Sequence, residues 1–234
     1  MQEPLSARAR LGLQLGLGAV LLIAAAWLFG AIAEDVVTGD ALTRLDVELA
    51  QWLHRRATPG VTRWMLIVTT LHSTVAIACY AAIAAALAGA KRDWRRIVTL
   101  AVCIGGGLAL NVMMKLAFHR ARPVFEHPLL TLTSYSFPSG HVAAATIFYG
   151  LGVVWVFGRT RRPRCRMLAL FGALLAIVLV ACSRMVLGVH YLSDVAAAFA
   201  EGVAWLALGL SGLAAFWRER AVAPAPASIA GGPR

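Results

Sequence analysis

Two histidines and one aspartate have a spacing that suits phosphoryl transfer. His190 and Asp194 are four residues apart, about one turn of a helix, so the carboxylate can accept a hydrogen bond from one imidazole nitrogen. This bond fixes the tautomer, leaves the other nitrogen able to attack phosphorus, and lets Asp194 stabilise the charge that develops on the ring. His141 can protonate the leaving oxygen and later activate water against the phosphohistidine. The three residues predict a histidine nucleophile with a separate acid/base.

Three cations without neighbouring carboxylates predict an anion site. Lys115, Arg122 and Arg184 have no acidic residue adjacent in the sequence, and the planar guanidinium of arginine matches phosphate oxygens. Ser139 and Gly140 precede an apolar segment whose helical N-terminus would direct backbone N–H groups at the same anion. Such cations neutralise charge on the equatorial oxygens, as metal ions do in many other phosphoryl-transfer enzymes. Because carboxylates are too few for a magnesium or two-metal site, we predict no metal and no cofactor.

The elements that position these residues are predicted to be membrane-spanning helices. The chain has 234 residues, of which 60% are hydrophobic and 14% charged, whereas a soluble domain is nearer half apolar and a quarter charged. Apolar segments of about 20 residues cross the hydrocarbon core as helices. Such segments cover 11–33, 65–90, 97–114, 142–158, 167–181 and 195–217. We predict an all-α, six-transmembrane helix bundle forming one domain over residues 1–220, and a disordered Ala/Pro/Gly-rich tail over residues 221–234.

Two segments near the N-terminus admit more than one interpretation. Residues 11–33 end in Ala-Ile-Ala, as a signal peptide would, but the run exceeds the usual signal length, which favours an uncleaved first span. Residues 41–54 carry leucines at helical spacing, with Thr38 or Asp40 available as the N-cap. This pattern predicts an amphipathic helix in the outer interface between the first two spans. The same pattern is compatible with a helix that guides lipid into a site.

Basic residues favour one orientation in the membrane. They cluster between the second and third spans, between the fourth and fifth, and after the sixth, and such clusters mark the cytoplasmic side. Both termini are then cytoplasmic, and the candidate site faces the periplasm from the inner membrane. The net charge of +11 suits anionic lipid headgroups, and the absence of a basic stripe with interleaved aromatic residues argues against nucleic acid as a partner. Nothing in the sequence specifies an oligomeric state.

Three stretches resemble the signature of the type 2 phosphatidic acid phosphatase superfamily, which includes lipid phosphate phosphatases and vanadium haloperoxidase-like proteins. The motifs K-x6-RP, PSGH and SR-x5-H-x3-D match Lys115 to Pro123, Pro138 to His141 and Ser183 to Asp194 at every position. The resemblance, to the membrane-embedded bacterial branch, implies His190 as the nucleophile and His141 as the acid/base. It also implies these phosphate ligands: Lys115, Arg122, Ser139, Gly140 and Arg184.

The motifs and the spans together predict an integral membrane phosphatase that hydrolyses a phosphomonoester or pyrophosphate on a lipid through a phosphohistidine. The resemblance implies substrates such as phosphatidic acid, phosphatidylglycerol phosphate or undecaprenyl diphosphate, and the Ala/Arg-rich composition favours the last two. A lipid phosphotransferase would use the same residues. A transporter or non-catalytic lipid-binding protein is disfavoured, because transporters usually hold their ionisable groups near the bilayer midplane.

Several other polar residues are left outside the predicted site. His72 and Glu201 lie within apolar segments, and for Glu201 an inward hydrogen bond is favoured over catalysis. Four residues of the second outer connection are interpreted as parts of a solvated loop, with a role in shaping a headgroup pocket as the alternative: His119, Arg120, Glu126 and His127.

Overall fold

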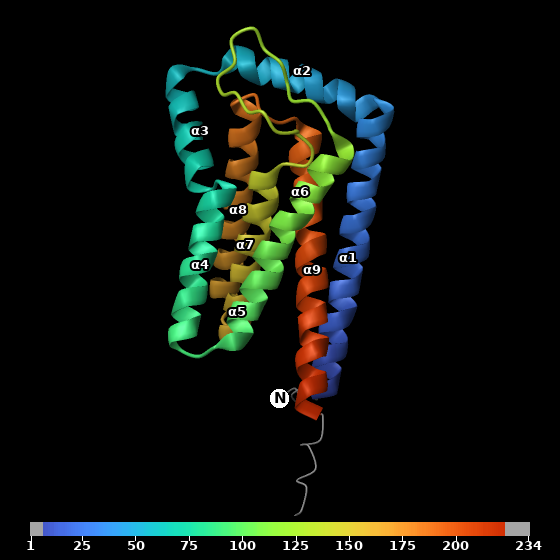
Figure 1. Ribbon diagram of the computed structural model, residues 1–234, viewed down its shortest axis with the longest axis vertical. Helices are drawn as coiled ribbons and strands as arrows, with labels where there is room; N and C mark the ends of the chain where they lie inside the picture. Colours follow the sequence, from blue (N-terminus) through green and yellow to red (C-terminus); the bar gives the residue numbers. More distant parts are fainter. Residues whose placement is uncertain (1–6, 223–234) are drawn as a thin grey trace, which may run out of the picture.

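The computed structural model describes residues 7–222, and within this range all regular secondary structure is helical (Figure 1). The elements are α1 (Ala7–Thr38), α2 (Ala41–Arg56), α3 (Pro59–Leu71), α4 (Thr74–Ala90), α5 (Trp94–Leu100), the π-helical turn η1 (Ala101–Gly105), α6 (Gly106–Phe118), α7 (Gly140–Arg159), α8 (Pro163–Val186) and α9 (Leu192–Val222). Within the described residues, six helical stretches are long and apolar enough to span a membrane, with α3–α4 and α5–η1–α6 each counting as one. The prediction of an all-α, six-span membrane protein is confirmed. The predicted tail begins within the last turn of α9 and, beyond Val222, lies outside the described residues.

The predicted interfacial helix is present as α2, which lies across one end of the bundle (Figure 1). Asp40 occupies the N-cap position, but its side chain makes no cap hydrogen bond, and the Thr38 hydroxyl makes none either. Instead, the carboxylate of Asp35, at the end of α1, accepts hydrogen bonds from the backbone N–H groups of Leu42 at 3.3 Å and Thr43 at 3.0 Å. The Thr38 hydroxyl donates to the Asp40 carboxylate at 2.6 Å. The cap therefore ties α2 directly to the first span.

The second span is interrupted, whereas the sequence predicts one helix over residues 65–90. It divides into α3 and α4 at His72 and Ser73, where the Ser73 hydroxyl accepts a hydrogen bond from a backbone N–H in the first turn of α4. His72 Nδ1 donates to the Val68 carbonyl at 2.8 Å, and its Nε2 accepts from the Tyr149 hydroxyl of α7 at 2.6 Å. Polar partners on both sides of the break satisfy groups that an apolar environment would leave unpaired.

The centre of the bundle is α7, which packs against α8 and α9. Small residues allow this approach: a Cβ atom added to Gly202 of α9 would lie 2.7 Å from the Thr146 Cβ of α7. On the outer side of α9 lies α1, whose Phe29 packs with Phe118 and Phe137 near the α2 end of the bundle. Phe137, in the loop that leads into α7, is thereby held against both α1 and α6 by ring contacts.

The third span contains the π-helical turn η1. A wider turn releases backbone carbonyls from the regular helical pattern, and Trp205 of α9 donates its indole N–H to the carbonyls of Val102 and Cys103 at 3.1 and 3.0 Å. The connections α6–α7 and α8–α9 emerge at the same end of the bundle as α2, opposite the α4–α5 turn (Figure 1). The residues singled out by the sequence motifs lie at that end.

Candidate active site

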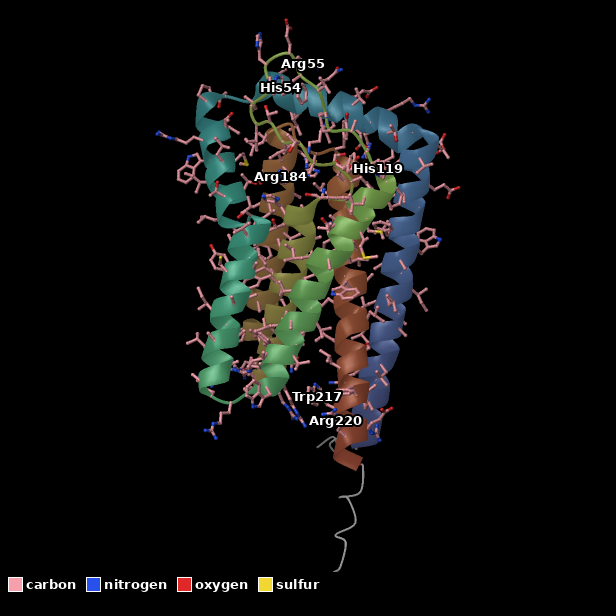
Figure 2. The ribbon with its side chains drawn as sticks, viewed as in Figure 1. His54, Arg55, His119, Arg184, Trp217 and Arg220 are labelled. Carbon is pink, nitrogen blue, oxygen red and sulfur yellow. The ribbon has the colours of Figure 1, made fainter. Side chains whose placement is uncertain are left out.

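A cavity of about 510 Å³ opens beneath α2, where α6 and α8 end and α7 begins. Six of the eight predicted site residues line it: Lys115, Arg122, Gly140, His141, Arg184 and His190. The other two, Ser139 and Asp194, are buried and joined by a hydrogen bond from the Ser139 backbone N–H to the Asp194 carbonyl at 3.1 Å. Figure 2 shows Arg184 at this end of the bundle, far from Trp217 and Arg220 at the opposite end. The structure thus brings the three motifs to one site.

The imidazole of His190 is buried between a carboxylate and a guanidinium. Its Nδ1 lies 3.2 Å from Asp194 Oδ2, and Arg122 Nη1 lies 3.2 Å from its Nε2. Because a guanidinium only donates hydrogen bonds, this arrangement assigns the proton to Nδ1 and the lone pair to Nε2. Burial lowers the pKa of His190 from 6.5 to about 3, and the hydrogen bond with Asp194 offsets only part of this shift. His190 is therefore neutral at physiological pH, with one nitrogen able to act as a nucleophile.

Backbone carbonyls orient two of the cations. Arg122 donates to the carbonyls of Ser134 and Val189, each at 2.6 Å, and to that of Tyr135 at 3.0 Å. Lys115 Nζ donates to the Tyr135 carbonyl at 2.8 Å. Carbonyl groups fix these side chains without neutralising them, because they carry no formal charge. Burial lowers the pKa of Arg122, so an anion in the cavity would stabilise its charged form.

Two buried donors next to the cavity have no hydrogen-bond partner among the described residues. Arg184 is only 2% exposed; its Nη1 donates to the Thr69 hydroxyl at 2.6 Å, but its Nε is unpaired. The Ser139 hydroxyl is likewise buried and unpaired. An unpaired buried donor costs free energy, and oxygens of an anion in the cavity would satisfy such groups. Gly140 starts α7 with so little room that an added Cβ atom would lie 3.0 Å from Asn111 Oδ1.

Arg120 is not part of a solvated loop, and this interpretation of the sequence was wrong. Its side chain is 12% exposed and bridges two fully buried carboxylates, Asp46 of α2 at 2.8 Å and Asp194 of α9 at 2.6 Å. Asp46 was not singled out from the sequence, although it follows Leu42 by four positions and so lies on the apolar face of α2. A carboxylate on the buried face of an amphipathic helix is the signal that could have found it. The remaining three polar residues of this connection are exposed, as a solvated loop requires: His119, Glu126 and His127.

Glu201 makes the inward hydrogen bond that the sequence favours. Asn111 of α6 donates to Glu201 Oε2 at 2.8 Å, and both side chains are buried. Asn111 also lines the cavity, so this pair lies at the cavity wall that faces the membrane interior. Glu201 Oε1 has no partner within the part of the chain that the structure describes.

Comparisons with known proteins place this site in a family context. The profile of the PAP2 superfamily matches residues 96–218. Phosphatidylglycerophosphatase B of Bacillus subtilis (strain 168) is 34% identical over 117 residues, which cover 48% of this chain and 55% of that protein. The chain therefore matches about half the length of this curated relative. The crystal structure of a transmembrane PAP2 type phosphatidylglycerolphosphate phosphatase from Bacillus subtilis superposes with a TM-score of 0.71 at 25% identity, over 85% of this chain and 96% of that one.

Proposed function

Because this chain belongs to the PAP2 superfamily, we propose that it is a membrane phosphatase that removes a phosphoryl group from a lipid without a metal ion. The observation that carries the proposal is the neutral, buried imidazole of His190 at a cavity that is also lined by Lys115, Arg122 and Arg184. A neutral imidazole is nucleophilic, and fixed cations stabilise the charge on a transferring phosphoryl group.

The reaction proceeds in two displacements. In the first, His190 Nε2 forms a bond to phosphorus while the bond from phosphorus to the lipid oxygen breaks, and His141 gives that oxygen a proton. Asp194 holds the proton on Nδ1 and stabilises the imidazolium. In the second, His141 takes a proton from water as the water oxygen attacks phosphorus, and the N–P bond breaks. Inorganic phosphate, neutral His190 and protonated His141 result, which is the state of both histidines before the first displacement.

The walls of the cavity support a lipid substrate. Besides the cations, the lining includes mostly apolar residues of α4 and α6, among them Val75, Ala78, Leu108 and Val112. Val75 and Val112 are 71% and 55% exposed, so this apolar part of the cavity is open to the surroundings of the protein. A headgroup phosphate can therefore reach the cations while the attached chain remains between α4 and α6 or in the bilayer.

The names of the relatives and the charge distribution support a specific substrate and a specific orientation. Phosphatidylglycerol phosphate is the leading substrate, because both relatives carry its phosphatase activity in their names. Undecaprenyl diphosphate is the second. The basic clusters at the α4–α5 and α7–α8 connections support a cytoplasmic location for that end, with the cavity near the periplasmic face of the inner membrane.

The decisive experiment measures inorganic phosphate released from a panel of lipid phosphates and diphosphates by the detergent-solubilised protein in EDTA. The wild type and His127→Ala, which changes an exposed loop histidine, should be active, and His190→Ala should lose at least about 1,000-fold in kcat. Rapid acid-free quenching with labelled substrate should trap an acid-labile phosphoenzyme in the wild type and in His127→Ala but not in His190→Ala. Unchanged activity of His190→Ala would exclude His190 as the nucleophile. Loss of activity in EDTA would exclude the metal-free reaction. Product that forms only with an acceptor lipid would identify a phosphotransferase.

A further inference from the structure

We propose that Arg120 and Asp46 are positioning residues. They fix the Asp194 carboxylate, which in turn keeps the His190 imidazole oriented for attack. The inference rests on the proposed function, since it concerns how His190 is kept ready to attack. It assigns a role to α2, the helix that lies across the site end of the bundle (Figure 1). The observation behind the proposal is a continuous chain of ion pairs and hydrogen bonds from Asp46 through Arg120 and Asp194 to His190, in which only Arg120 is partly exposed.

The two oxygens of Asp194 have separate partners. Oδ2 lies 3.2 Å from His190 Nδ1 and accepts from the Tyr191 backbone N–H at 2.9 Å, whereas Oδ1 accepts from Arg120 Nη1 at 2.6 Å. With one oxygen bound to a guanidinium, the carboxylate cannot rotate without breaking a charge-assisted hydrogen bond. The Oδ2 atom is therefore kept toward the imidazole, and the imidazole is kept in the tautomer with a lone pair on Nε2.

Arg120 is itself held from the side of α2. Its Nη2 donates to Asp46 Oδ2 at 2.8 Å, and its guanidinium lies 4.5 Å from the ring centroid of Tyr191. Asp46 also accepts from the Ser193 backbone N–H at 2.9 Å and from the Ser193 hydroxyl. Asp46 is fully buried, and a carboxylate in that environment needs such partners. One α2 side chain thus binds both Arg120 and the residue that precedes Asp194.

Arg120 lies between Lys115 and Arg122 in the sequence, but its contacts differ from theirs. Both of its terminal nitrogens donate to carboxylates, while those of Arg122 donate to carbonyls and a hydroxyl and approach His190. Arg120 is absent from the lining of the cavity that contains His190 and Arg184. Its charge is therefore compensated within the protein, and its effect on the reaction passes through Asp194.

The test compares carboxamide variants of buried and exposed side chains. Asp46→Asn has Glu48→Gln as its control, because Glu48 is an exposed carboxylate on the same helix, and Arg120→Gln has Arg55→Gln, an exposed α2 arginine (Figure 2). We expect kcat and the single-turnover rate of phosphoenzyme formation to fall about 10-fold in Asp46→Asn and about 100-fold in Arg120→Gln, as small misplacements of a reacting group do. The KM for the lipid phosphate and the inhibition constant of inorganic phosphate should change less than about twofold.

A double variant tests whether the two residues act in series. If Asp46 acts through Arg120, the Asp46→Asn/Arg120→Gln protein should have the kcat of Arg120→Gln alone, because the single effects are not additive. Additive losses would overturn the inference, as would a weaker inhibition by phosphate in Arg120→Gln with kcat unchanged, which would make Arg120 a phosphate ligand. Equal activities of Asp46→Asn and Glu48→Gln would also overturn it.

A milder variant covers the case in which Asp46→Asn does not fold. Ser193→Ala removes one hydroxyl that touches both Asp46 and Arg120 and leaves no buried charge unpaired. Its kcat should fall about threefold to tenfold with KM unchanged, and a wild-type kcat in a folded Ser193→Ala protein would contradict the inference. Failure of the underlying phosphatase proposal would be visible separately, as activity that persists in His190→Ala.

Discussion

At the scale of single residues, the burial that keeps His190 neutral also makes it a source of pH-dependent stability. Its folded pKa is about 3 and its ordinary value is 6.5, so the unfolded chain takes up a proton at this histidine below pH 6.5 while the folded chain does not. Unfolding is therefore favoured as the pH falls through this window. At pH 5.5 the loss relative to neutral pH should be about 1.4 kcal/mol from this group.

Reversible unfolding in mixed detergent micelles at pH 7.5 and 5.5 measures this contribution. The drop in unfolding free energy should be smaller in His190→Asn than in the wild type, by about 1.4 kcal/mol. His127→Asn serves as the control, because that side chain is exposed and should leave the wild-type drop unchanged. An identical drop in all three proteins would show that His190 is not protected from protonation in the folded state.

The residues that could be predicted from the sequence are those whose partners are close in the chain or belong to a motif. His190 and Asp194 follow from a four-residue spacing, and their hydrogen bond is present in the structure. Arg120 could not be paired with Asp46 in this way, because the two are 74 residues apart. Their contact depends on how α2 lies over the bundle, which local periodicity does not encode.

At the scale of elements, the contact between α7 and α9 sets the distance between the two halves of the site. α7 carries His141 and α9 carries Asp194, and the helices approach closely at Gly202. Gly202→Ala should cost about 1–3 kcal/mol by overpacking, because the new Cβ atom meets Thr146 at 2.7 Å. It should also lower kcat, since separation of the helices moves His141 away from the nucleophile.

Another glycine on the same helix provides the matched control. An added Cβ atom at Gly212 has nothing within 4 Å, so Gly212→Ala should keep wild-type activity and stability or gain slightly from the better helix propensity of alanine. Thermal unfolding and phosphate release, measured on both variants in the same detergent, separate the two outcomes. Equal behaviour of the two variants would show that α7 and α9 can separate at no cost.

The elements were largely predictable because hydrophobic length and amphipathic spacing are local properties of the chain. All six spans and α2 appear in the structure. The break at His72 and Ser73 was not predicted, because both neighbouring helices are apolar and the interruption depends on a hydrogen bond to Tyr149 of a different span. The cap of α2 by Asp35 was missed for a related reason, since the carboxylate lies before the turn, seven and eight residues from the N–H groups it accepts from.

At the scale of the whole molecule, the cavity has a cationic part and an apolar part, just as a lipid phosphate has an anionic headgroup and an apolar chain. Cations and the buried histidine lie toward α2, and the mostly apolar wall formed by α4 and α6 lies toward the middle of the membrane. Because Val75 and Val112 of this wall are exposed, the proposed lipid substrate would not need to leave the bilayer before its phosphate reaches His190. On the proposed function, we therefore expect the chain of the lipid, and not only its headgroup, to contribute to recognition.

Val112 tests this arrangement, because it lines the cavity from α6 and is 55% exposed. Val112→Trp should narrow the space between α4 and α6 and lower kcat/KM for a long-chain lipid phosphate at least about 10-fold more than for its dihexanoyl analogue, which can approach from water. Met113→Trp is the control, since the neighbouring side chain is 62% exposed but does not line the cavity. Equal losses on both substrates in Val112→Trp would mean that the residue supports the site itself and that long chains approach by another route.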